Sequence, residues 1–276
     1  MTGSAVAVAA IEIRLGTRNR WLLLSAIVLT GFALVLGFVG AAPTGTVKVD
    51  PLTVSVANLA TLTVYLVPLM ALLLAFDAFA GEVERGTIQL VLASPINRFS
   101  LVAGKFLGHL FVLGTAVAIG YGLAGAAVYL FAGGTADGLT SLARLIISGI
   151  GLGATFLAIG YVASALTRQS GTAAACAIGI WLVAVVLYDL ALFGALVADA
   201  DGVFSRVVFP WLLLVNPADA FRLFNLALLE TGESANSLSG IATALPFPAW
   251  TGVLSLAFWT VFAMALSALL VRRIEP

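Results

Sequence analysis

Long, nearly uninterrupted apolar runs constrain this 276-residue chain more than any other feature. A helix that rises 1.5 Å per residue needs about 20 largely apolar residues to cross roughly 30 Å of hydrocarbon. Six runs meet that requirement, and they cover Trp21–Gly40, Leu59–Ala80, Phe106–Phe131, Leu142–Leu166, Gly171–Val197 and Trp250–Val271. Backbone polar groups inside lipid must be bonded within their own segment. The runs therefore predict an all-α membrane protein, with six transmembrane helices in a single domain over residues 1–276.

Composition supports the same fold class. Hydrophobic residues make up 62% of the chain and charged residues 9%, whereas a soluble domain carries about a quarter charged residues. The 13 basic and 13 acidic residues balance, so no basic excess indicates a nucleic-acid partner. One cysteine, Cys176, and one histidine, His109, are too few for a thiolate or imidazole metal cluster, and no metal site is expected.

Ordinary structural roles are favoured for both of these residues. Cys176 lies early in the fifth apolar run, where we expect a small buried side chain. His109 has no carboxylate beside it in sequence, so a structural or interfacial role is favoured over acid–base catalysis, which needs a positioned partner. The first run begins only at Trp21 and continues for a full span, which predicts a permanent anchor and not a cleavable signal peptide.

Basic residues gather on one side of the predicted topology. The side that holds both termini carries Arg14, Arg18, Arg20, Arg85, Arg98, Lys105, Arg168, Arg272 and Arg273. The opposite side carries only Lys48, Arg144, Arg206 and Arg222. Because Lys and Arg favour cytoplasmic loops, both termini are expected in the cytoplasm. The external side has an acidic cast from Asp50, Asp137, Asp199, Asp201, Asp219, Glu230 and Glu233.

Three segments outside the runs also have a recognisable pattern. Residues 4–18 predict an interfacial helix, whose basic residues favour anionic lipid by about 1 kcal/mol each. The cytoplasmic segment 81–105 is too polar for lipid, and Thr87–Ala93 within it predicts a short surface helix. The external segment 198–249, between the fifth and sixth runs, is long enough to form structure of its own.

The external segment contains one clear helix signal. Asn216 followed by Pro217 combines a capping side chain with proline at the first helical position. On the side opposite Arg222 and Asn225, apolar residues recur at helical spacing. They are Phe221, Phe224, Leu228 and Leu229. The pattern predicts an amphipathic helix that lies on the outer membrane surface or against a partner.

Two acidic residues fall inside apolar runs, where an ionisable group is costly. Asp77 lies near the cytoplasmic end of the second run, and both interfacial solvation and a role in transmitting motion are open for it. Asp189 lies about two-thirds along the fifth run. Two interpretations of Asp189 stay open. It either forms a packed hydrogen bond or lies at the external interface, or it has a functional role.

The chain lacks the nucleotide-binding pattern G-x-x-x-x-G-K-[ST]. Gly104-Lys105 is followed by Phe106, and the position five before Gly104 is Phe99. The chain is therefore expected to be non-catalytic and to hydrolyse no ATP by itself.

One segment resembles part of a known family. The stretch LLLAFDAFAGEVERGT, Leu72–Thr87, followed by Pro95, Arg98 and GKFLGH at Gly104–His109, resembles ABC-2 type permeases. The resemblance implies the six-span ABC-2 (type V) permease fold, with ATP and Mg²⁺ held by a separate ATPase subunit. It also implies that the polar segment is the coupling helix region that docks onto this ATPase. The expected contacts are Glu82, Glu84, Arg85, Gly86, Thr87, Pro95 and Arg98.

Two further segments narrow the resemblance. Arg18-Asn19-Arg20-Trp21 and PWLLLVNPADAFRLFNL, Pro210–Leu226, are similar to NosY-type permeases, the membrane subunits of a transporter needed to mature the copper sites of nitrous oxide reductase. That family implies a location in the bacterial inner membrane, a second copy of the chain, two cytoplasmic NosF-type ATPase subunits and a periplasmic β-helical NosD-type protein. The candidate contacts with the periplasmic protein are then Asn216, Asp219, Arg222 and Asn225.

The residues themselves leave several functions open. A conduit for Cu(I) should present Cys or Met ligands at matched depths, and the chain has one Cys and three Met. This scarcity favours a subunit that transmits motion to an external partner, while translocation of a sulfur species or another small solute stays open. Export of a lipid or hydrophobic drug and a stand-alone membrane scaffold are the alternatives, because one fold can serve all of these functions.

Overall fold

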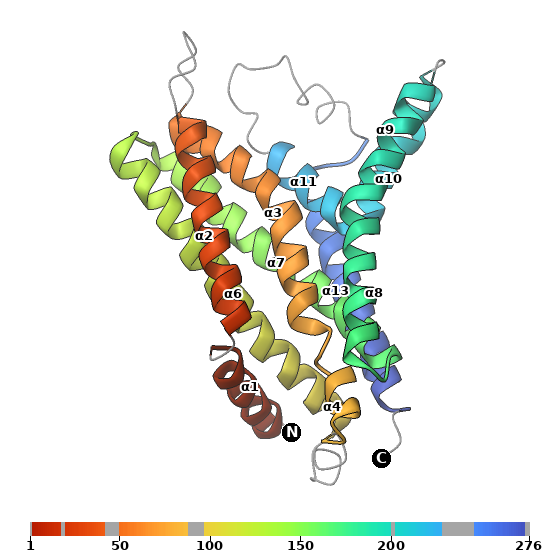
Figure 1. The fold of residues 1–276 in the computed structure, drawn as a ribbon. Helices are drawn as coiled ribbons and strands as arrows, with labels where there is room; N and C mark the ends of the chain where they lie inside the picture. Colours follow the sequence, from red (N-terminus) through yellow and green to blue (C-terminus); the bar gives the residue numbers. More distant parts are fainter. Residues whose placement is uncertain are drawn as a thin grey trace.

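The computed structural model describes residues 2–17, 20–41, 50–87, 97–199, 202–227 and 246–273, and all regular structure in these ranges is helical. Long helices run between two ends of the molecule (Figure 1). Both chain termini lie at the lower end in that view, which we call the terminal end. The other end is called the opposite end.

Thirteen helical elements are described, and two of them, η1 and η2, are π-helical turns. The elements are α1 (Thr2–Thr17), α2 (Arg20–Ala41), α3 (Pro51–Ala75), α4 (Ala80–Glu84), α6 (Arg98–Phe131), α7 (Ala136–Leu166), α8 (Ser170–Trp181), η1 (Leu182–Leu187), α9 (Tyr188–Ala198), η2 (Phe204–Val208), α10 (Phe209–Val215), α11 (Pro217–Ala227) and α13 (Thr251–Val271).

Capping residues begin three of the long helices earlier than the apolar runs do. The Asp50 side chain accepts a hydrogen bond from the Thr53 N–H at 3.0 Å and precedes Pro51 at the start of α3. Asn97 begins α6 and Thr135 begins α7 in the same way. A cap satisfies N–H groups that a helix start leaves unbonded. Hydropathy marks only the apolar part of each helix, so the second, third and fourth helices begin before the apolar runs that predicted them.

Five helical segments are long and apolar enough to cross a membrane, and they are Pro51–Glu84, Arg98–Phe131, Ala136–Leu166, Ser170–Ala198 and Thr251–Val271. A sixth candidate is a bent pair, in which Phe204–Val215 and Pro217–Leu226 meet at 109°. The predicted first run is also a helix, α2, of 22 residues. The all-helical prediction is confirmed, and the described residues support five to six apolar crossings.

The centre of the bundle is the packing of α3 against α6 and α7. Two tyrosines on α6 and α7, Tyr121 and Tyr161, are fully buried there. The Thr63 hydroxyl of α3 lies 2.8 Å from the Tyr121 hydroxyl, so this buried polar group has a partner. α1 lies across the terminal part of α6 (Figure 1). Gly104 and Gly108 allow this close approach, since a Cβ on Gly108 would lie 2.6 Å from the Glu12 Cβ.

A turn at residues 76–79 separates α3 from α4, and one serine of α7 holds it. The Ser164 hydroxyl donates to the Phe76 carbonyl at 2.6 Å and accepts from the N–H groups of Phe79 and Ala80, both at 3.0 Å. All three backbone groups would otherwise lack partners at the break. α4 is therefore fixed relative to the bundle although the helix before it has ended.

The external segment differs from its prediction. Asn216 does cap a helix, because its Oδ1 accepts from the Ala218 N–H at 3.1 Å, and α11 follows. The predicted position on the membrane surface is wrong, since α11 packs against α3, α7 and α13, and Phe221 is fully buried. A Cβ on Gly252 of α13 would collide with the α11 backbone, so this glycine permits the contact. Leu228 and Leu229 lie outside the described residues.

Other sequence expectations have mixed outcomes. Cys176 was expected to be buried, but it is exposed on α8. The cause is that only 11% of an apolar 18-residue window of Ser170–Ala198 is buried, so most of that window faces outward. A helix is present where the interfacial helix at residues 4–18 was expected, as α1, and its position at the membrane interface stays a prediction. Most of the expected surface helix Thr87–Ala93 lies outside the described residues.

Candidate functional site

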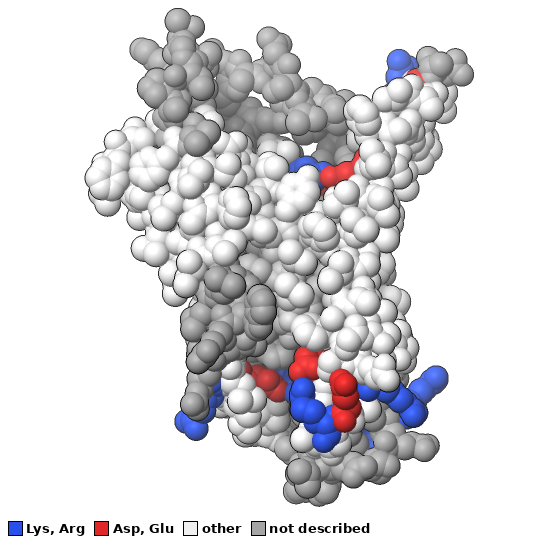
Figure 2. All heavy atoms as spheres, in the orientation of Figure 1, with Lys and Arg blue, Asp and Glu red and all other residues white. Residues whose placement is uncertain are grey.

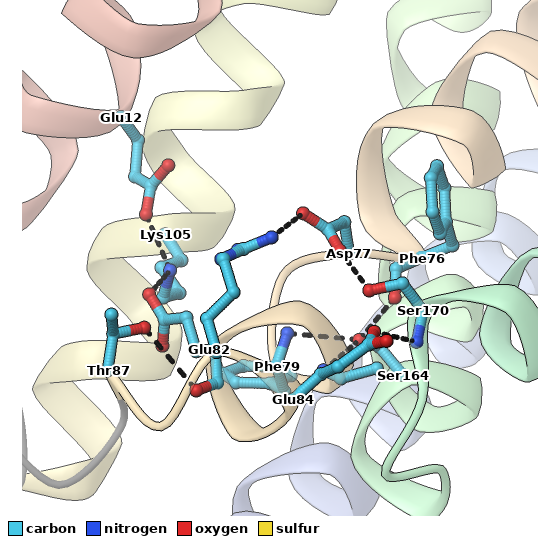
Figure 3. Close-up of polar contacts among 12 residues, drawn as sticks. Glu12, Phe76, Asp77, Phe79, Glu82, Glu84, Thr87, Lys105, Ser164 and Ser170 are labelled. Atoms are coloured by element: carbon cyan, nitrogen blue, oxygen red, sulfur yellow. Dashed lines mark hydrogen bonds and ion pairs between the residues drawn. The ribbon is translucent and has the colours of Figure 1, made fainter.

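A buried lysine joins three elements at the terminal end (Figure 3). Lys105 Nζ of α6 lies 2.6 Å from Glu12 Oε1 of α1 and 2.7 Å from Glu82 Oε1 of α4. The Lys105 side chain is only 5% exposed. Because an unpaired charge is costly at such depth, this lysine ties α1 and α4 to the same point of α6.

His109 extends this cluster by one turn of α6. Its Nε2 lies 3.3 Å from Glu12 Oε2, and its Nδ1 lies 2.8 Å from the Tyr161 hydroxyl of α7. Burial alone would raise the pKa of Glu12, but the hydrogen bond with His109 and the charge of Lys105 outweigh burial and lower that pKa to about 2. Glu12 is therefore ionised at neutral pH.

His109 has no carboxylate beside it in sequence, but Glu12 of another helix supplies one in three dimensions. Sequence reasoning missed Glu12, Lys105 and Tyr161 as members of one cluster. Two signals were available. Glu12 is an acidic residue in a largely apolar helix, and the pair of glycines at 104 and 108 marks where another helix can approach.

A second group of carboxylates binds the start of α8 (Figure 3). Asp77 Oδ1 accepts from the Ser170 hydroxyl at 2.7 Å, and Asp77 Oδ2 lies 3.1 Å from Arg85 NH1. Glu84 Oε2 accepts from the Ser170 N–H at 2.7 Å. Negative side chains are favourable at a helix N-terminus, where N–H groups are unbonded and the helix dipole is positive. The α3–α4 turn and α4 thus hold the first residue of α8.

The predicted coupling residues fall into three groups. Glu84, Arg85, Gly86 and Thr87 are exposed at the terminal end, and Gly86 has a positive φ of 68° that suits glycine. The prediction that Glu82 is an outward contact needs correction, since its side chain points inward to Lys105.

Arg98 and Pro95 form the remaining group. Arg98 NH1 donates to the carbonyls of Val271 and Arg272 at the end of α13, so Arg98 joins α6 to α13. Pro95 lies outside the described residues.

A polar cluster at the opposite end connects α9 to α11. Arg222 NH2 lies 3.0 Å from Asp189 Oδ2, and Arg222 NH1 lies 2.8 Å from Asp219 Oδ1. The Tyr188 hydroxyl donates to the Leu212 carbonyl of α10 at 2.8 Å. For Asp189, the structure shows a packed hydrogen bond and ion pair, which was one of the two interpretations left open.

Asn216 adds a contact with a π-helical turn. Its Nδ2 donates to the Ala184 carbonyl in η1 at 2.7 Å and to Asp219 Oδ2 at 2.9 Å. A π-helical turn changes the local hydrogen-bond register of a helix, and such turns are frequent at functional sites. The bend of the η2–α10–α11 hairpin is therefore attached to the point where the α8–α9 helix changes register.

The predicted partner-contact residues are mostly turned inward. Asn216, Asp219 and Asn225 are 4%, 2% and 3% exposed. Asn225 bonds to Ser148 of α7 at 3.0 Å. The expectation that the polar side of this helix faces outward is corrected, because these side chains form hydrogen bonds with each other and with neighbouring helices. The Arg222 side chain is 28% exposed, and contact with an external protein stays a prediction.

Comparison with known proteins agrees with the resemblance found in the sequence. Residues 6–273 match the profile of a family described as "ABC-2 family transporter protein". A "Probable ABC transporter permease protein NosY" of Stutzerimonas stutzeri is 38% identical over 264 residues, which cover 95% of each chain. A protein of the same name from Pseudomonas aeruginosa is 39% identical over 264 residues, again 95% of each chain.

Proposed function

The chain belongs to the ABC-2 family of transporter permeases, and from this premise we propose that a separate cytoplasmic ATPase, which holds ATP and Mg²⁺, drives it through the α4 region. Both termini then lie in the cytoplasm and the chain crosses the inner membrane six times. The exposed residues Glu84, Arg85, Gly86 and Thr87 form the docking surface. The distribution of Lys and Arg supports this orientation.

One observation carries the mechanism. A single continuous helix, from α8 to α9, is bound by the carboxylates at Ser170 and by the Arg222 cluster. Asp77 and Glu84 bind Ser170 at the start of α8, whereas Arg222 and Asn216 bind Asp189 and the Ala184 carbonyl in the second half of the same helix. The helical segment from α8 to α9 has 29 residues, which corresponds to about 43 Å. Movement of α4 by the ATPase would therefore displace the hairpin at the opposite end.

We propose that this motion serves the assembly of the copper sites of nitrous oxide reductase in the periplasm. The likeness to proteins named NosY supports this assignment, as does the scarcity of Cys and Met ligands for Cu(I) transport. Two copies of the chain, two NosF-type ATPase subunits and a NosD-type periplasmic protein would form the complex. Movement of a sulfur species or another small solute is a variant of the same proposal, and export of a lipid or hydrophobic drug is the alternative.

Charge reversal at the docking surface tests the first step. We expect Glu84→Lys to abolish co-purification of the ATPase subunit with the full chain. Asp137→Lys is a control, because Asp137 is also an exposed carboxylate on a helix but lies at the opposite end. Undiminished co-purification with Glu84→Lys would contradict docking at α4.

A change at the hairpin tests the proposed product. Arg222→Met removes the ion pairs with Asp189 and Asp219 but keeps an unbranched side chain. We expect insertion and ATPase co-purification to persist, while nitrous oxide reductase from these cells lacks its catalytic copper centre. A reductase with full copper content would exclude the maturation role, and ATPase stimulation by a lipid or drug would favour export.

A further inference from the structure

A cavity of about 550 Å³ lies beside the Lys105 cluster at the terminal end. Leu15 of α1 and Met70, Leu73 and Leu74 of α3 form an apolar part of its wall. Leu15 is 61% and Leu73 is 43% exposed, so this wall continues onto the side of the bundle. Cavities of this size accommodate small organic ligands or a lipid headgroup with part of its chains.

The same wall also carries charged side chains and His109. Glu12, Asp77 and Glu82 contribute three carboxylates, whereas Lys105 and Arg85 contribute two cations. In Figure 2, acidic and basic side chains lie side by side near the terminal end. Lys105 is shared by two of the carboxylates, and the buried Glu82 Oε2 has no hydrogen-bond donor. The wall therefore has acceptor capacity for one further cation that can donate hydrogen bonds.

Two residues at the mouth of the cavity are open to a ligand. The Asp77 side chain is 39% exposed and the Arg85 side chain is 56% exposed. Arg85 uses only NH1 to bind Asp77, and a guanidinium has five N–H donors in total. Planar guanidinium groups bind phosphate well, so an acceptor for a cation and a donor for an anion are adjacent here.

We propose that this cavity binds a zwitterionic phospholipid with a primary ammonium headgroup, that is, phosphatidylethanolamine. The ammonium is bound by Asp77 and Glu82, the phosphate by Arg85, and one acyl chain lies along Leu73 and Leu15. A purely anionic headgroup would bring no cationic donor to the unpartnered Glu82 Oε2. A choline headgroup carries no N–H and cannot donate to these oxygens. The proposal rests on the membrane location of the chain but not on docking of the ATPase.

The test is native mass spectrometry of the full chain released from vesicles of equal parts phosphatidylethanolamine, phosphatidylglycerol and phosphatidylcholine. We expect one retained phosphatidylethanolamine per chain, and about a tenfold loss of retention in Leu73→Trp, which fills the apolar wall. Leu123→Trp is the matched control, since Leu123 lies on α6, is 56% exposed and does not line the cavity. It should retain lipid like the unchanged chain.

Two results would overturn the lipid site. One is equal retention of phosphatidylglycerol and phosphatidylethanolamine, and the other is retention that Leu73→Trp does not reduce. If Leu73→Trp fails to insert, Leu15→Trp fills the same cavity from α1 and decides the question. ATPase co-purification is measured on the same variants, so loss of lipid with an intact complex separates this site from the docking surface.

Discussion

Replacing Lys105 with methionine would isolate the charge that joins α1 and α4 to α6. Removing one partner of a buried ion pair costs about 3–5 kcal/mol, because the remaining charge is left unpaired. Here the lower limit of about 3 kcal/mol applies, since Glu12 keeps His109 as a partner and the Glu82 side chain is 18% exposed. The predicted effect is therefore a specific loosening of α1 with the rest of the bundle retained.

The size of that loosening can be measured at Val8. Val8 is 8% exposed, and its side chain faces Gly104 in the contact between α1 and α6. A change of about 3 kcal/mol, at about 1.4 kcal/mol per tenfold, increases the detached fraction of α1 by about 150-fold. With Val8→Cys in a Cys176→Ser background, the rate of maleimide labelling should rise by that factor, provided that α1 opens and closes faster than it is labelled.

A compensating variant tests the electrostatic cause. Adding Glu12→Gln and Glu82→Gln to Lys105→Met removes both carboxylates as well as the lysine. Most of the protection of Val8→Cys against maleimide should therefore return. The reasoning is refuted if Lys105→Met speeds labelling by less than about threefold, or if the compensated variant labels as fast as Lys105→Met alone. Either result would mean that packing at the two glycines, and not charge, holds α1.

Three further predictions concern the same end of the bundle. Gly108→Leu should detach α1 as measured by the same labelling, because even a Cβ there lies 2.6 Å from the Glu12 Cβ. A Cβ on Gly122 meets nothing within 4 Å, so Gly122→Leu should have no effect. The folded pKa of Glu12, about 2, is lower than its ordinary value of 4.5, so its stabilising contribution is complete above that value and is lost as the pH falls through about 2. Hydrogen exchange of α1 amides should speed up over this range, and Glu12→Gln should abolish the change. Ser164→Ala leaves two buried N–H groups without an acceptor, which should cost about 1–3 kcal/mol and lower the melting temperature in detergent.

Properties that depend on local sequence could be predicted. Apolar runs of membrane-spanning length became helices, because in an apolar chain the period and length of hydrophobicity decide the element. The helix cap at Asn216, followed by Pro217, was also predicted, because the capping side chain and the N–H that it binds are two residues apart in sequence. The resemblance around Leu72–Thr87 correctly indicated the family that the profile match later showed.

Properties that depend on packing between distant segments could not be predicted. The polar side of α11 suggested an exposed face, because polarity in a soluble context means contact with water. In this bundle the donors on Arg222 and Asn216 are matched by Asp189 and the Ala184 carbonyl from another helix, and that pairing has no signal in either segment alone. Glu12 and Lys105 are a similar case, in which two costly charges predict a partner but not its identity.

In the proposed mechanism, the contacts of Asp77 and Asp189 are two separate points at which the α8–α9 helix can be pulled. Asp77 binds Ser170, and Asp189 follows Ser170 by 19 positions on the same continuous helix, which corresponds to about 28 Å. That distance is close to the hydrocarbon thickness of roughly 30 Å, so each carboxylate can lie near one membrane surface. The residues between them are apolar, with an outward face, and carry no charge. Sliding or tilting of the α8–α9 helix by a few ångströms would therefore move no unpaired charge into lipid, and its free-energy cost would be set by the contacts at the two ends. Substitutions should therefore separate motion from insertion at these two contact points, which are Ser170 with its two carboxylates and Arg222 with its own two.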